Sequence, residues 1–237
     1  MTFTPTEYSY ESATTAKTVF QKDHTPTIIW DWNGTLLNDV QVCIASMNTL
    51  LRKHHLPTLK SVQEYRQKFC FPVEHYYKRV GFDFSRTPFT DLARDFIHEY
   101  HTNRGKSSLS PGSAEVLKTF KNLGYRQIIV SASQKDTLEK QTRELGVDHF
   151  FTEILGIQNI YARSKQDIAR QWMDSTGTIG TATVLIGDTE HDYEVARHIG
   201  SHCILYSQGH QHVHPPEGIQ LIHDLAKAPG VVQALLS

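Results

Sequence analysis

The stretch Thr27-Ile28-Ile29-Trp30-Asp31-Trp32-Asn33-Gly34-Thr35 places an acidic residue directly after a short apolar run. A continuous apolar run bounded by polar and glycine residues is typical of a strand that is buried on both faces of a parallel sheet. We therefore predict a strand that ends at Asp31 and a turn around Gly34. Such a turn can surround the carboxylate with backbone N–H groups, which suit a phosphate.

Further apolar runs of the same kind follow along the chain, at residues 127–130, 183–186 and 202–205. Helical patterns separate them, and several of these patterns end at a glycine that suits a left-handed helix cap. The helical patterns cover residues 114–123, 136–145, 165–173 and 191–199. This alternation predicts an α/β fold, with a doubly wound, three-layer, Rossmann-like core around a parallel sheet.

The segment at 40–108 has a different pattern, in which amphipathic helices such as Val40–His54 and Thr90–Thr102 occur without a convincing strand. We interpret it as a small α-helical cap inserted into the core. Residues 1–24 are rich in Thr, Ser and Tyr, with a short helical pattern at Ala13–Phe20. The predicted divisions are an N-terminal extension at 1–24, a core at 25–39 and 109–237, and a cap at 40–108.

Composition excludes several classes of protein. The formal net charge of −1 offers no basic excess of the kind that nucleic-acid binding requires. No apolar run approaches the length of a membrane span, and the N-terminal stretch lacks the apolar region of a secretory signal. Cys43, Cys70 and Cys203 form neither a disulfide framework nor a CxxC zinc pattern. We expect a cytoplasmic protein that binds neither nucleic acid nor membrane, and a small anionic substrate fits this composition.

Polar residues follow the predicted strands, at the edge where open α/β sheets bind ligands. Ser131 offers a hydroxyl, and Lys165 is a point charge that can hold a phosphoryl group and neutralise a carboxylate. Asp188 and Asp192 lie four residues apart at a strand–helix junction, and such hard oxygen ligands suit Mg²⁺. Each feature alone also fits an ordinary turn, helix cap or surface lysine. Their order and strand context predict one shared crevice with Asp31.

The order of these residues resembles the four signature motifs of the haloacid dehalogenase superfamily, with Asp31, Ser131, Lys165 and Asp188/Asp192 in sequence. The helical segment after the first motif resembles the cap of that superfamily. Within it, Phe71–Tyr77 followed by Val80-Gly81-Phe82 is similar to the helical, C1-type caps of phosphoglycolate phosphatase-like members. The resemblance extends from Thr27 almost to the end of the chain.

The resemblance implies a phosphoric monoester hydrolase that acts on a small phosphorylated metabolite. Asp31 is then the nucleophile that forms an aspartyl-phosphate. The implied Mg²⁺ ligands are Asp31, the backbone carbonyl of Asn33, Asp188 and Asp192. The implied phosphate-binding residues are Gly34, Thr35, Ser131, Ala132 and Lys165, and the candidate substrate contacts in the cap are His75, Tyr76 and Arg79.

One position departs from the pattern of the superfamily. Most of its phosphatases carry a second Asp where this chain has Asn33, and that Asp protonates the leaving group and then activates water. An amide can do neither, although general acid–base catalysis typically contributes ~10²–10⁴-fold. Three readings stay open: a slow enzyme, a substrate with a good leaving group such as an acyl phosphate or pyrophosphate, or a substitute among Asp39, Glu190 and His191.

Other functions also stay open at this point. The chain can be a non-catalytic protein that binds a phosphorylated ligand or docks a partner. It can also be a phosphonatase-like C–P hydrolase, although Phe71–Tyr77 lacks the cap lysine expected there and only Lys68 and Lys78 flank it. The acidic pair after the third strand argues against a metal-free C–halogen hydrolase. For the histidine-rich run at 209–214, we expect a loop after the last core strand rather than a metal site.

Overall fold

The computed structural model describes residues 22–103, 105, 107–157 and 164–237, so the helical pattern predicted at Ala13–Phe20 lies outside the described residues. Its main sheet has six strands in the order β5-β4-β1-β6-β7-β8, and every neighbouring pair is parallel. The strands are β1 (Thr27–Trp30), β4 (Arg126–Gln134), β5 (Glu153–Ile157), β6 (Thr183–Gly187), β7 (His202–Tyr206) and β8 (Gln220–Ile222).

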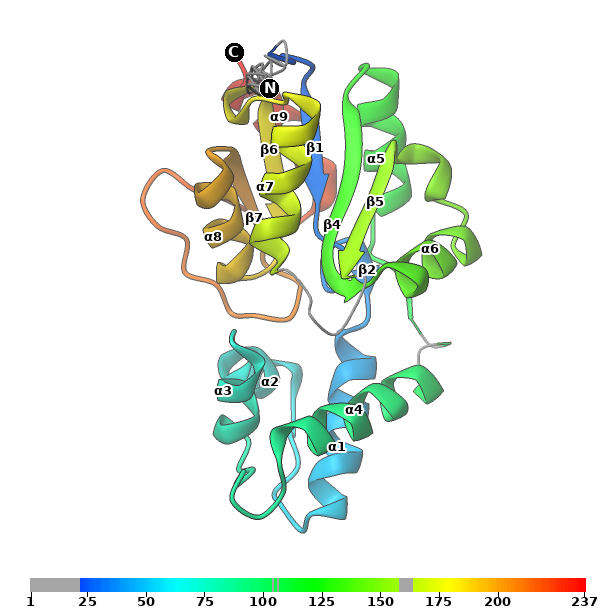
Figure 1. The fold of residues 1–237 in the computed structure, drawn as a ribbon, viewed down its shortest axis with the longest axis vertical. Helices are drawn as coiled ribbons and strands as arrows, with labels where there is room; N and C mark the ends of the chain where they lie inside the picture. Colours follow the sequence, from blue (N-terminus) through cyan, green and yellow to red (C-terminus); the bar gives the residue numbers. More distant parts are fainter. Residues whose placement is uncertain (1–21, 104, 106, 158–163) are drawn as a thin grey trace, which may run out of the picture.

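Helices cover both faces of this sheet, as Figure 1 shows. Along β1, side chains alternate between two apolar clusters, with Ile28 and Trp30 in one and Ile29 in the other. The first cluster is covered by α5 (Ser113–Asn122), α6 (Lys135–Glu144) and α9 (Ala228–Leu235), and the second by α7 (Lys165–Thr176) and α8 (Glu190–Ile199). The predicted doubly wound α/β core is confirmed.

Two parts of the sheet structure were not predicted from the sequence. The edge strands β5 and β8 were not predicted, and neither was a small antiparallel pair formed by β2 (Leu37–Asn38) and β3 (Ser108–Leu109). All are short or partly exposed, so they lack the continuous apolar run of the central strands. Because β8 follows β7, the histidine-rich run at 209–214 lies between two strands and not after the last one.

Four helices lie beyond the carboxyl ends of the strands, below the arrowheads of β1 and β4 in Figure 1. They are α1 (Val40–Lys53), α2 (Val62–Lys68), α3 (Val73–Arg79) and α4 (Phe89–Asn103). They enclose an apolar cluster of their own, which includes Met47, Leu51, Tyr65 and Leu92. The division into core and cap stays a prediction, with this separate cluster in its favour. Within the described ranges, no helix is both long and apolar enough to cross a membrane.

Candidate active site

Three carboxylates meet at the carboxyl edge of the sheet. The register pairs Trp30 of β1 with Ile186 of β6, so the chain leaves both strands at the same edge, with Asp31 and Asp188 just beyond. One carboxylate oxygen from each of Asp31, Asp188 and Asp192 lies within 4.8 Å of the others, and all three residues are buried. The convergence expected from strand order is therefore present in the structure.

Lys165 lies inside this acidic group. It is the first residue of α7, which begins with a capping box between Ser164 and Asp167. Its Nζ lies 2.5 Å from Oδ1 of Asp31 and 2.5 Å from Oδ1 of Asp192. Burial lowers the pKa of Lys165, but the two carboxylates outweigh burial and raise it above its usual range. The ammonium is thus held charged between two acids.

The charge of the group is not balanced by that lysine. Burial raises the pKa of Asp31 well above its ordinary value against the opposing effect of Lys165, and burial likewise raises the pKa of Asp188. For Asp192, the ammonium and the Thr189 hydrogen bonds outweigh burial, and the pKa is lowered. When all three clustered carboxylates are ionised, one ammonium leaves surplus negative charge in a buried place. Their hard oxygen atoms suit Mg²⁺, so the residues present fit a divalent cation.

Asp192 also stabilises the first turn of α8 (Glu190–Ile199), a common role for an acidic residue at a helix start. Thr189 is the N-cap of α8, and its side chain donates a 2.7 Å hydrogen bond to Oδ2 of Asp192. The same oxygen accepts the backbone N–H groups of Asp188 at 3.2 Å and Thr189 at 3.0 Å. One carboxylate oxygen therefore fixes the start of the helix, while Oδ1 faces Lys165.

A cavity of about 310 Å³ adjoins the acidic group. Its lining brings together most of the predicted site residues, namely Asp31, Asn33, Tyr76, Ser131, Ala132, Lys165, Asp188 and Asp192. His75 and Arg79 are exposed and lie outside this lining, because successive positions of α3 point in different directions, and of these three candidates only Tyr76 lines the cavity. Their predicted contact with substrate is not favoured by this geometry.

Gly34 and Thr35 support the site without lining the cavity. Gly34 has φ +79°, and a Cβ atom there would lie 2.4 Å from the His210 ring and 2.5 Å from the Asp188 carboxylate. The Thr35 hydroxyl is fully buried and donates a 2.9 Å hydrogen bond to Asp188. The Thr35 hydroxyl is therefore committed to a carboxylate. The backbone N–H groups of Gly34 and Thr35 also donate within the protein, so the predicted phosphate contacts of these two residues are not favoured by this geometry.

Asn33 is held on both sides of its amide. Its Nδ2 donates to Oδ2 of Asp39 at 2.7 Å and to the Tyr100 hydroxyl at 3.2 Å. Its Oδ1 accepts a 2.7 Å hydrogen bond from the Ser133 hydroxyl. The residue thus connects the first turn of the core to a cap helix.

Asp39 and His210 contact each other, and the sequence did not predict this contact. His210 Nε2 lies 3.0 Å from Oδ1 of Asp39, and its Nδ1 lies 2.8 Å from the Tyr65 hydroxyl. Burial lowers the pKa of His210, but Asp39 outweighs burial and the pKa rises to about 9. Burial raises the pKa of Asp39, but His210 and two further hydrogen bonds bring it below its ordinary value. The two residues form a buried ion pair at the wall of the cavity.

Of the three acid–base substitutes considered, Asp39 and His191 line the cavity, and Glu190 is exposed and does not. No local signal pointed to His210, because it lies 171 positions from Asp39 in a loop between strands. Its backbone N–H also donates a 2.6 Å hydrogen bond to Asp188, which ties that loop to the acidic group.

A family model for haloacid dehalogenase-like hydrolases matches residues 28–206, which is most of the chain and all four motifs. The chain belongs to the haloacid dehalogenase-like hydrolase family. The predicted family and the prediction of an enzyme of this hydrolase class are therefore confirmed.

Relatives within the haloacid dehalogenase-like family agree with this assignment. A phosphoglycolate phosphatase of Pseudomonas syringae is 23% identical, over 79% of this chain and 71% of the relative. The pyrophosphatase PpaX of Bacillus pumilus is 25% identical, over 70% of this chain and 76% of the relative. A crystal structure described as a putative phosphoglycolate phosphatase from Lactobacillus delbrueckii has the same fold, with a TM-score of 0.70, 20% identity, and coverage of 90% of this chain and 99% of that one.

Proposed function

We propose that the protein is a Mg²⁺-dependent phosphatase that hydrolyses a small phosphorylated molecule through an aspartyl-phosphate on Asp31. The observation that carries the proposal is the buried group of Asp31, Asp188 and Asp192, whose carboxylate oxygens lie within 4.8 Å of one another beside Lys165. The names of the relatives, phosphoglycolate phosphatase and pyrophosphatase, support a small phosphorylated substrate. A cytoplasmic setting is part of the proposal, and all three cysteines are free thiols.

Mg²⁺ would be held by Asp31, Asp188, the Asn33 backbone carbonyl, and Asp192 directly or through water. When bound, it supplies the positive charge that allows an anionic carboxylate to approach an anionic phosphoryl group. Lys165 contributes a fixed positive charge beside the nucleophile. The hydroxyl of Ser131, which lines the cavity, is a donor available for the phosphoryl oxygens.

The first chemical step forms a bond between a carboxylate oxygen of Asp31 and phosphorus. The bond from phosphorus to the leaving oxygen breaks, and that oxygen keeps the electron pair. Because Asn33 has no proton to give at the required pKa, the leaving group departs as an anion and takes its proton from water. In the second step, water attacks phosphorus, the phosphorus–Asp31 bond breaks, and phosphate and the free carboxylate result.

The geometry disfavours C–P bond cleavage through a cap lysine. Lys68 forms a 3.0 Å ion pair with Glu64, and the ammonium of Lys78 lies over the Phe84 ring at 5.4 Å. Neither lysine belongs to the described lining of the cavity. A Schiff-base mechanism therefore has no cap lysine among the described lining residues, whereas the phosphoryl-transfer mechanism has its nucleophile.

The test is phosphate release from p-nitrophenyl phosphate with Mg²⁺, whose leaving group barely needs an acid. We expect turnover that EDTA abolishes and that Asp31→Asn reduces by at least ~10³-fold. Asp91→Asn, at an exposed ion pair with Arg94 on α4, is the matched control and is expected to leave turnover unchanged. Full activity of Asp31→Asn contradicts the mechanism. Mg²⁺-dependent phosphate binding without turnover favours the non-catalytic reading.

A further inference from the structure

The cap side of the cavity is built from aromatic rings. Phe69, Phe71, Tyr76, Tyr77, Phe89 and Phe96 all belong to its lining. They contact one another edge to face or tilted, with ring centroids 5.6 Å apart for Phe69–Phe71, 5.2 Å for Phe69–Tyr76 and 5.3 Å for Tyr77–Phe89. A cavity of about 310 Å³ has room for a phosphoryl group and a ring, since about 150 Å³ holds benzene.

The positive groups of the cavity are already paired. Lys165 lies between Asp31 and Asp192, and His210 is paired with Asp39. The third basic side chain of the described lining, His191, lies 3.3 Å from Glu194. The described lining residues that come from the four cap helices and their connections carry no charged side chain. A second anionic group on a substrate, such as a carboxylate or another phosphoryl group, would therefore be buried with no free cation among the described lining residues. Burying an unpaired charge is costly, so the cavity selects against such a substrate.

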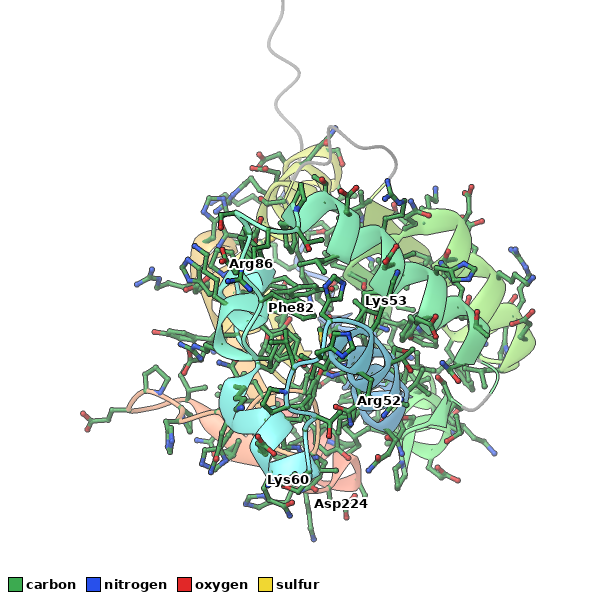
Figure 2. The ribbon with its side chains drawn as sticks, turned by 90° about the horizontal axis from the view of Figure 1, so that it is seen from below. Arg52, Lys53, Lys60, Phe82, Arg86 and Asp224 are labelled. Atoms are coloured by element: carbon green, nitrogen blue, oxygen red, sulfur yellow. The ribbon has the colours of Figure 1, made fainter. Side chains whose placement is uncertain are left out.

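The cations of the cap lie elsewhere. The Arg66 guanidinium donates to the backbone carbonyls of Gln208 and Gly209. Arg66 and Arg79 line a second pocket, which shares Phe69 and Phe71 with the first. Arg52 and Lys53 are in the last turn of α1, at the end of the cap turned away from the sheet, as Figures 1 and 2 show.

Asn33 adds an independent chemical restriction. Without a proton donor, the leaving oxygen departs as an anion, so its basicity governs the rate of the first step, formation of the aspartyl-phosphate. A phenol has a pKa of about 10, whereas water, which resembles a simple alcohol, has about 15.7. An aryl oxygen is therefore a far better leaving group at this site than an alkyl oxygen. The rings of the cap and the amide at position 33 favour the same kind of molecule.

We propose that the cap side of this cavity binds an uncharged aromatic group, so that the substrate is a phosphate monoester of a phenol-like alcohol. This inference rests on the proposed phosphatase function and names its substrate class. The phosphoryl group faces Asp31 and Lys165, while the ring packs among Phe69, Phe71 and Phe96.

The experiment compares phenyl phosphate with 4-carboxyphenyl phosphate in the presence of Mg²⁺. The scissile bond is the same, and the carboxylate makes its phenol a slightly better leaving group, so chemistry alone favours the charged substrate. We expect kcat/KM to be at least ~10-fold higher for phenyl phosphate, which corresponds to about 1.4 kcal/mol. We expect 1-naphthyl phosphate to exceed phenyl phosphate because it buries more apolar area. Equal values, or a preference for the carboxylate, overturn the inference.

A substitution at the mouth of the cavity tests whether the lack of a free cation causes this substrate preference. Ile97 of α4 lines the cavity and is 51% exposed, so Ile97→Arg adds a cation there with little risk to folding. We expect the preference for phenyl phosphate to shrink or reverse. Leu123→Arg is the control, since Leu123 is 60% exposed at the end of α5 and outside the lining. An equal effect of the two variants contradicts the proposal.

Acetyl phosphate separates this inference from the function on which it rests. It is small, carries no ring, and has a leaving group that needs no acid, so it reports on the core residues alone. Turnover of acetyl phosphate with no preference for neutral aryl phosphates overturns only the substrate class. Absence of turnover on acetyl phosphate and on every aryl phosphate overturns the phosphatase function as well.

Discussion

The Asn33 side-chain amide donates a 2.7 Å hydrogen bond to the Asp39 carboxylate, and this contact explains why an amide suits position 33. Asp39 is buried, and His210 and hydrogen bonds hold its pKa below the ordinary value despite burial, so it is ionised. An aspartate at position 33 would place a second carboxylate against it. Like charges at such a distance force one of the two groups to keep a proton.

The first prediction concerns the exchange of these two residues. Asn33→Asp alone is expected to lower the free energy of unfolding by about 1–3 kcal/mol, because it replaces a donor with an acceptor beside Asp39. In Asn33→Asp/Asp39→Asn the amide and the carboxylate change places, and the hydrogen bond is restored in the opposite direction. We expect the double variant to hydrolyse ethyl phosphate at least ~10²-fold faster than the unmodified chain. Kinetics and urea unfolding measure the two effects.

Asp39→Asn alone is the control for that exchange, because it removes the carboxylate without adding an acid at position 33. It is expected to give no gain on ethyl phosphate. A single Asn33→Asp variant that matches the double variant in activity on ethyl phosphate would show that the Asp39 contact does not restrict position 33.

A second prediction follows from the missing base. Formation of the aspartyl-phosphate from an aryl phosphate needs little acid, but its hydrolysis must activate water without a carboxylate at Asn33. We expect the second step to limit the rate, so that the phospho-enzyme accumulates. Rapid mixing with p-nitrophenyl phosphate should show a burst of nitrophenol on the order of one equivalent per chain. Asp31→Asn should show none, and a linear time course from the first turnover in the unmodified chain would place the slow step earlier.

The central part of this site could be predicted because strand order determines it. Asp31 and Asp188 follow adjacent parallel strands, and Lys165 begins a helix that packs on the same sheet, so topology alone brings them to one edge. The buried strands β1, β4, β6 and β7 could also be predicted from the sequence, since each carries a continuous apolar run.

Other features depend on tertiary contacts that leave no local pattern. His210 lies in an irregular loop, and nothing near it in the sequence marks Asp39 as its partner. The aromatic wall was hidden for a different reason, because rings at helical spacing are equally typical of a cap core. Tyr65 and Phe96, for example, contribute both to that core and to the lining of the cavity.

The third prediction tests the Asp39–His210 ion pair by a double-mutant cycle. His210→Gln should lower the free energy of unfolding by about 3 kcal/mol, because it leaves the Asp39 carboxylate buried without its cation. Asp39→Asn should lower the free energy of unfolding by a similar amount, because it leaves His210 buried without its carboxylate partner. The double variant should cost less than the sum of the two single variants, since it leaves no unpaired charge. Urea denaturation measures each value.

His75→Gln is the matched control for that cycle, because His75 is exposed on α3. It should change the free energy of unfolding by less than about 0.5 kcal/mol. Strict additivity of His210→Gln and Asp39→Asn would mean that the pair contributes no coupling energy.

The last prediction concerns pH and lies far from the active site. Asp23 accepts the backbone N–H of Thr25 at 2.9 Å and a 2.5 Å hydrogen bond from Arg126, which connects the segment before β1 to β4. These contacts, with those from Thr25 the largest, lower the pKa of Asp23 to about 2 from 3.8. The folded pKa lies below the unfolded one, so the stabilisation is present above about pH 4 and is lost as pH falls through about 2.

Asp23→Asn is therefore expected to lower the free energy of unfolding at pH 7 by about 1 kcal/mol, a value reduced for screening because the side chain is 25% exposed. The difference from the unmodified chain should shrink on acidification and vanish below the folded pKa, because both proteins then carry a neutral group at that position. Asp91→Asn, at an exposed pair on α4, should have an effect of less than about 0.5 kcal/mol at pH 7. Urea unfolding at a series of pH values measures both differences, and a cost of Asp23→Asn that does not change with pH would assign it to lost packing rather than to charge.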